Sequence, residues 1–161
     1  MSKFGFLKRT HIATGRAGWR WMELPEVTSE CRLLLANATQ ENKAMLEEAL
    51  RIVESRRSER GSTTVSKFEK GVERDKILIH KHLLKGWEGM WEIDEETGKP
   101  ILQDGEKVAI EFSSENAWDF LEQCPGWIVT LIRDWAKDPE NFIDGPEVEE
   151  PIPHANDLGN S

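Results

Sequence analysis

The chain has 161 residues, of which 38% are hydrophobic and 32% charged, and its formal net charge is −9. These values suit one domain with a modest apolar core. No apolar run approaches the roughly eighteen residues of a membrane-spanning helix, and the start, MSKFGFLKRT, lacks the apolar stretch of a signal peptide. We therefore expect a cytoplasmic location and no membrane association.

The charge is unevenly distributed along the chain. Residues 1–85 hold 17 basic and 11 acidic side chains, a balance of +6, whereas residues 86–161 hold 4 and 19, a balance of −15. The first half can attract a phosphate backbone and the second would repel one. We favour the simpler interpretation, in which two oppositely charged, solvated faces attract each other within the fold.

Residues 3–24 predict a β-hairpin. The segment KFGFLKR alternates apolar and polar positions, and ATGRAG is turn material. WRWMEL then alternates again, with Trp19 and Trp21 on one face.

Residues 26–85 predict helices. EVTSECRLLLANAT predicts a short helix with Leu34 and Leu35 facing inward, and Thr39 is the expected cap of the next helix, QENKAMLEEALRIVESRRSER. The inward positions of that second helix are Met45, Leu46, Ala49, Leu50 and Val53.

A third helix is expected from about Val65 to Lys85, behind a cap at residues 62–64. Gly86 should end this helix as a C-cap residue. The predicted inward stripe consists of Val65, Phe68, Val72, Ile79 and Leu83.

The second half predicts strands followed by helices. Residues 87–112 are strand-like, with a short hairpin near 90–112 whose turns are EETGK and QDGEK. Residues 114–142 predict two helices, which the breaker CPG separates. Ser113 or Ser114 should cap the first of them.

Residues 144–161 are acidic, contain prolines and lack periodicity, so we expect them to be disordered. The other elements make a mostly helical α+β fold, which we expect to form a single domain over residues 1–143.

Residue types that support catalysis or bind metals do not occur in suitable patterns. His80 and His82 are two positions apart on a predicted helix, so they face different directions and cannot hold one ion as i,i+4 histidines do. Cys31 and Cys124 lie in apolar settings and are expected to be buried free thiols. We expect no cofactor, no metal and no enzymatic activity.

The chain has seven tryptophans and no tyrosine. Most tryptophans in a domain of this size belong to the core, but tryptophan is also enriched at the anchoring centres of interfaces. We expect Trp87 in the core and Trp91 closer to the surface. The composition therefore favours a binding or assembly protein.

Residues 80–142 combine several short motifs in a fixed order. A predicted helix is followed by Trp87 and Gly89 and then by the acidic turn DEETGKP. A strand then ends at Phe112 and Ser113, a helix opens with ENA, and a last helix closes on AKDPENF. In this order and spacing the chain resembles tail assembly chaperones of long-tailed bacteriophages, and the inserted segment ILQDGEKVAIE departs from the pattern.

The resemblance implies a non-catalytic partner of the tape-measure protein, a long helical chain that sets tail length. Such chaperones keep this client soluble in the host cytoplasm until tail-tube protein polymerises around it, and they are absent from the finished tail. The expected partners are the tape-measure protein and the tail-tube protein. A homo-oligomer is also expected, because wide apolar helix stripes are often buried between subunits.

In this role a groove between helices would hold an apolar client helix through a few large anchors and a polar rim. The expected anchors are Trp87, Trp91, Trp118, Trp127, Trp135 and, at the edge, Phe142. The expected rim acids, which would favour a lysine-rich client, are Glu88, Glu92, Asp119 and Glu122.

Two other functions fit the sequence. A structural tail or head-completion subunit would use the charged helices and the hairpin in a ring contact, and it would remain in purified particles. A small phage regulator would bind nucleic acid through the basic first half, at LKRTHIATGRAGWRW or ESRRSER, with strong salt sensitivity. The acidic second half and the lack of a recognised module disfavour nucleic acid as a partner.

Overall fold

The computed structural model describes residues 3–13, 15–55 and 64–143. Its strands are β1 (Arg20–Glu23), β2 (Arg32–Leu35), β3 (Leu84–Glu88), β4 (Leu102–Gln103) and β5 (Glu106–Lys107). Its helices are α1 (Lys43–Ser55), α2 (Thr64–Leu78), α3 (Ser114–Gln123) and α4 (Gly126–Lys137). Shorter turns are the 3₁₀ segments η1 (Gly5–Thr10), η2 (Gly15–Gly18) and η4 (Pro139–Asn141), and the π-helical turn η3 (Ile79–Leu83). The predicted α+β class is confirmed.

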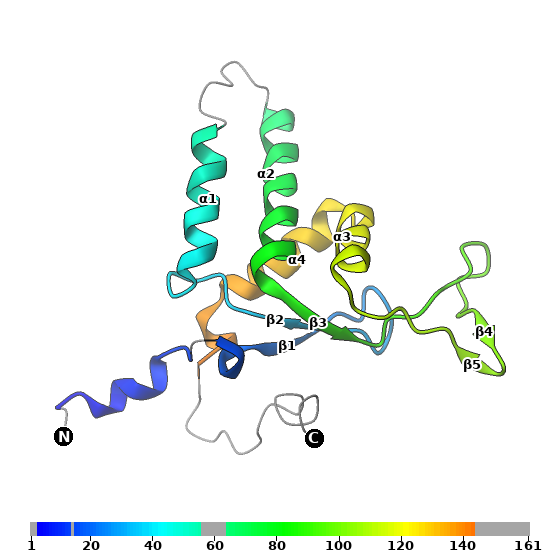
Figure 1. Ribbon diagram of the computed structural model, residues 1–161, viewed down its shortest axis with the longest axis horizontal. Coiled ribbons are helices and arrows are strands. Elements are labelled where there is room, and N and C mark those ends of the chain that lie inside the picture. The colour runs from blue at the N-terminus through cyan, green and yellow to red at the C-terminus, as the bar shows by residue number, and fades with distance from the viewer. Residues whose placement is uncertain (1–2, 14, 56–63, 144–161) are drawn as a thin grey trace.

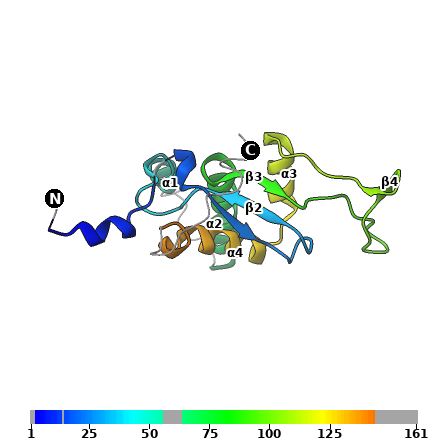
Figure 2. The ribbon, with the colours of Figure 1, turned by 90° about the horizontal axis from the view of Figure 1, so that it is seen from below.

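The main sheet is antiparallel, with strand order β1-β2-β3, and helices α1 to α4 all lie on one side of it (Figures 1 and 2). Leu33 of the central strand lies opposite Met22 on one side and Trp87 on the other, and all three pack in the core. Leu33, Leu34 and Leu35 are each buried. An uninterrupted apolar run suits a central strand of this kind, because both of its faces are covered.

The N-terminal part corrects two predictions. The strand that pairs with β1 is β2, so the RLLL segment forms a strand and the short helix predicted there is wrong. Because β2 supplies the partner of β1, residues 3–9 pair with none of the described strands. Gly5–Thr10 forms a 3₁₀ segment in which Leu7 N donates to the carbonyl of Phe4, so the strand predicted there is also wrong.

The helix α1 begins later than predicted. The side chain of Asn42 accepts a hydrogen bond from Met45 N at 3.3 Å, so Asn42, and not Thr39, caps the helix. Met45 is buried as expected. Leu50 and Val53 were expected to face inward, but they are 63% and 47% exposed.

The helix α2 continues through η3 directly into β3. Gly86 therefore lies inside a strand, and the prediction that it ends a helix as a C-cap is wrong. Phe68, predicted to face inward, is 63% exposed, whereas Ile79 and Leu83 are fully buried as expected. Residues 56–63 and 144–161 lie outside the described residues; they include the end of the second predicted helix, part of the predicted cap of the third and the predicted disordered tail.

The second half follows the sequence prediction closely. Ser113 caps α3, since its hydroxyl accepts a hydrogen bond from Asn116 N at 3.0 Å, and α4 follows the break at Pro125. None of the described helices is long and apolar enough to cross a membrane.

Residues 91–110 form a projection that we call the arm, on the right of Figure 1. Three short segments of the arm are joined by backbone hydrogen bonds. Glu92 N donates to the carbonyl of Val108, Val108 N donates to the carbonyl of Ile101, and Ile101 N donates to the carbonyl of Glu92. The predicted turns are both present. In the first, the Asp94 carboxylate accepts hydrogen bonds from Glu96 N and Thr97 N, and Gly98 adopts a φ of +71°.

Candidate apolar groove

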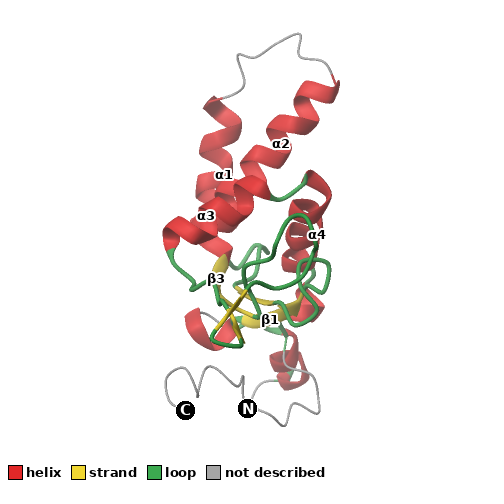
Figure 3. Cartoon of the chain, turned by 90° about the vertical axis from the view of Figure 1, so that its right-hand side faces the viewer, coloured by secondary structure: helices red, strands yellow, loops and turns green. Residues whose placement is uncertain are grey.

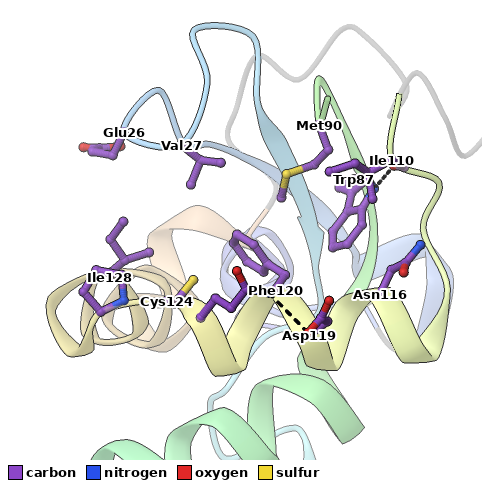
Figure 4. Close-up of a pocket in the computed structure, with 12 residues that line it drawn as sticks. Glu26, Val27, Trp87, Met90, Ile110, Asn116, Asp119, Phe120, Cys124 and Ile128 are labelled. Carbon is purple, nitrogen blue, oxygen red and sulfur yellow. Dashed lines mark hydrogen bonds between the residues drawn. The ribbon is translucent and has the colours of Figure 1, made fainter. Parts of the chain in front are cut away.

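An open groove of about 330 Å³ lies between α3, the start of α4, the end of β3 and the loop after β1 (Figure 4). Large apolar side chains from all four segments line it, namely Val27, Trp87, Met90, Phe120 and Ile128. The carboxylates of Glu26 and Asp119 lie at its rim. The groove therefore combines an apolar floor with an acidic edge.

Trp87 is held in place from several directions. Its indole Nε1 donates a hydrogen bond to the carbonyl of Ile110 at 2.8 Å. Its ring meets those of Phe112 and Phe120 edge-on, with centroids 5.1 and 5.7 Å away. Because these contacts fix the indole before anything binds, a partner would not have to order this part of the floor.

The acidic edge follows from the sequence of α3. This helix, SENAWDFLEQ, carries Glu115, Asp119 and Glu122 and no basic residue. Gln123 donates a hydrogen bond to Asp119 at 3.2 Å, and the loop after β1 adds the exposed Glu26. These carboxylates favour basic groups on whatever lies in the groove, and Lys76 of α2, which donates a hydrogen bond to the carbonyl of Glu122 at 3.3 Å, offsets part of their field.

Trp127 adds exposed aromatic surface beside the groove. It is 60% exposed, whereas the other six tryptophans are partly buried. Its neighbours Pro125 and Ile128 line the groove. Gly126 brings α4 close to α2, since a Cβ at this position would lie 3.5 Å from Val72 and 4.0 Å from the ring of the exposed Phe68.

The structure brings only some of the predicted partner-binding residues together. Trp87 and Asp119 line the groove, and Glu122 is exposed on the same helix as Asp119. Trp91 lies on the arm, where Lys107 Nζ is 3.7 Å from its ring centroid. Trp118 meets the ring of His80 edge-on at 5.3 Å.

The remaining predicted residues lie elsewhere. Trp135 and Phe142 stack edge-on at 5.3 Å near the end of α4, and Phe142 is fully buried. The prediction that Phe142 lies at the edge of a groove is therefore wrong, because its ring completes the core. Glu88 pairs with Arg32, and Glu92 is exposed on the arm.

Several groove residues were missed. The pattern of α3 identifies Phe120 as an apolar helical position, but nothing in the sequence marks Val27, Met90 or Glu26 as part of a site. These residues reach the groove through the pairing of β2 with β1 and β3, and a local pattern does not show strand pairing.

Two histidines and both cysteines lie within the fold. His80 Nε2 lies 3.0 Å from the carbonyl of Ser114, and His82 lies 3.4 Å from Glu48, whose pKa this hydrogen bond lowers. Cys31 and Cys124 are buried free thiols, as predicted, and burial raises the pKa of each to about 11. Within the described residues no group of three His, Cys, Asp or Glu side chains can hold a metal ion.

Residues 36–150 match the family described as YdaY prophage protein. The matched range contains all four helices, β3 and the arm, and hence every part of the groove except the loop after β1. No curated protein and no solved structure matches the chain. Because the match spans 115 of 161 residues, the chain belongs to the YdaY prophage protein family and is of phage origin.

Proposed function

We propose that this prophage protein is a non-catalytic tail assembly chaperone. It would bind the tape-measure protein in the host cytoplasm and keep it soluble until the tail tube polymerises. The observation that carries the proposal is the preformed apolar groove with an acidic rim and the exposed Trp127 beside it. The phage family and the resemblance over residues 80–142 supply the context.

The size of the groove suits a client that must be released. A volume of about 330 Å³ accepts one or two bulky side chains of an amphipathic helix. Burying about 150 Å² of apolar surface contributes roughly 4 kcal/mol, before the entropic cost of association is subtracted. One groove therefore gives weak and reversible binding, and a long client would recruit several copies of the chaperone along its length.

The rim charges select the client. Basic side chains that flank an apolar stripe would approach Glu26 and Asp119, which speeds encounter and makes binding weaken as salt rises. An acidic helix with the same apolar stripe would be repelled.

The basic first half is a poorer candidate surface. Arg16 and Lys85 already lie over the ring of Trp19, at 5.9 and 5.5 Å from its centroid, and Arg32 lies 4.6 Å from that of Trp21. Binding of a nucleic acid through these rings would have to displace those cations.

Co-expression with the tape-measure protein of the same genome tests the proposal. We expect the client to be soluble, and to copurify, only when this chain is present. Trp127→Ala and Asp119→Lys should each reduce copurification, whereas Leu102→Ala, which truncates a side chain of similar exposure on the arm, should not. A client that stays insoluble and does not copurify would overturn the proposal, and this chain in purified particles would instead indicate a structural subunit.

A further inference from the structure

The helix α1 carries more apolar surface than the described residues cover. Ala49 and Ile52 pack beside the buried Met45. Leu50 and Val53, one turn apart, are 63% and 47% exposed. At about 100° per residue, the apolar arc from Ile52 to Leu50 spans roughly 160°, which is wider than the stripe of about 100° that one contact requires.

The exposed part of this arc is open to another molecule. Figures 1 and 3 show α1 and α2 side by side, projecting away from the sheet. In Figure 1, α1 lies on the opposite side of α2 from α3, and hence away from the groove. A molecule on α1 would leave the groove accessible.

The charges of the two helices are compatible with a second copy of this chain as this molecule. Residues 43–55 of α1 have a net charge of −1 and residues 64–78 of α2 have +1, so the pair is neutral. The described residues from Leu84 onward, by contrast, hold 14 acids and 5 bases. Two copies would repel each other through that acidic part, but not through the helical pair.

We propose that the outer face of α1 is a self-association surface, which a second copy of this chain covers through Leu46, Leu50 and Val53. A two-fold axis across antiparallel copies of α1, placed close to Leu50, packs Leu50 against its equivalent and Leu46 against Val53 of the second copy. Lys43, Glu47 and Glu54 border the stripe, and the two-fold arrangement sets Lys43 of one copy beside Glu54 of the other.

The interface is small. A helix of 13 residues is about 20 Å long, so the contact lies at the low end of stable protein interfaces. The dimer should therefore dissociate on dilution, and a basic client would still prefer the acidic groove to this neutral stripe.

The mass of the full chain in solution, measured by light scattering during size-exclusion chromatography over about a hundredfold range of concentration, tests the proposal. We expect the mass to rise from 18.5 kDa toward twice that value. Leu50→Glu should hold the protein at 18.5 kDa with an unchanged circular dichroism spectrum. Leu102→Glu, which alters an equally exposed leucine on the arm, should behave as the wild type.

A cysteine variant tests the same surface without adding a charge. Because Cys31 and Cys124 are buried, Leu50→Cys provides an accessible thiol next to the two-fold axis and hence beside its equivalent in the second copy, and mild oxidation should link two chains. Leu102→Cys should remain unlinked. A wild type that is monomeric at every concentration would overturn the proposal. A Leu50→Glu variant that still reaches the mass of a dimer but no longer solubilises the client would also overturn it, because the stripe would then bind the client.

Discussion

Gly89, after β3, lies against the backbone of Glu30, so that a Cβ at position 89 would stand 2.1 Å from the Glu30 carbonyl oxygen. Thr28 strengthens the same junction, since its hydroxyl donates a hydrogen bond to the carbonyl of Gly89 at 2.5 Å. The junction joins the loop after β1 to the end of β3, and these two segments form one wall of the groove.

Gly89→Ala should destabilise the protein strongly, because the new methyl group meets backbone that cannot move aside and the residue has a φ of +72°. We expect a loss of roughly 2–4 kcal/mol in the free energy of unfolding, measured with urea. Gly98→Ala is the control, since its φ is +71° but no atom lies within 4 Å of the added Cβ. It should cost about 1 kcal/mol, and equal losses for the two variants would contradict the steric explanation.

The ion pair between α2 and α4 predicts a second contrast. Asp75 is 3% exposed and accepts a hydrogen bond from Arg133 Nη1 at 2.9 Å. Asp75→Ala should cost about 2 kcal/mol in thermal or chemical unfolding, because it leaves the partly buried Arg133 without its inner partner. Asp134→Ala removes an exposed carboxylate 2.8 Å from the same guanidinium and should cost under about 0.5 kcal/mol. If Asp134→Ala lowered the free energy of unfolding more than Asp75→Ala does, Asp134 would be the more important partner of Arg133.

Glu48 predicts a dependence of stability on pH. Its hydrogen bond with His82, and then the nearby Lys81 and Arg51, lower its pKa below the ordinary 4.5. The folded state therefore favours the ionised form, and this stabilisation is present above pH 4.5 and lost as the pH falls through the lower folded value. Glu48→Gln should melt at a lower temperature than the wild type at neutral pH, with the difference shrinking near pH 3. A difference that is the same at both pH values would exclude the carboxylate as its cause.

The cysteines predict slow thiol chemistry. Burial raises the pKa of Cys31 and Cys124 to about 11, so only about one thiol in a thousand is ionised at pH 8. The native protein should react slowly with a colorimetric disulfide reagent, and both thiols should react quickly in urea. Leu102→Cys, at an exposed position of the arm outside the proposed self-association surface, should add one fast thiol to the native protein. Rapid reaction of the unfolded and native wild type alike would show that these side chains are accessible.

The sequence predicts the second half of the fold well because its signals are local. The cap at Ser113, the break at Pro125 and the turn at Asp94 each depend on residues within a few positions of one another. The first half depends on distant pairing. A run such as RLLL fits a helix or a buried strand equally, and its position between β1 and β3 decides the outcome.

The groove is predictable only in part for the same reason. Trp87 and Asp119 stand out by residue type, but their neighbours Val27 and Met90 are ordinary apolar residues that the sheet brings to the site. Phe142 shows the opposite error. Its large aromatic ring was expected at the edge of the groove, but it is buried in the core.

The absence of a loop between α2 and β3 limits how the family can change in length. The described chain passes from Leu78 through η3 to Leu84 without a break. One inserted residue would either rotate α2 by about 100° relative to the sheet or turn the side chain of Trp87 to the opposite face. The π-helical turn η3 itself accommodates one residue more than an α-helical turn does. Insertions and deletions among relatives should therefore avoid residues 79–87 and accumulate in the turns of the arm.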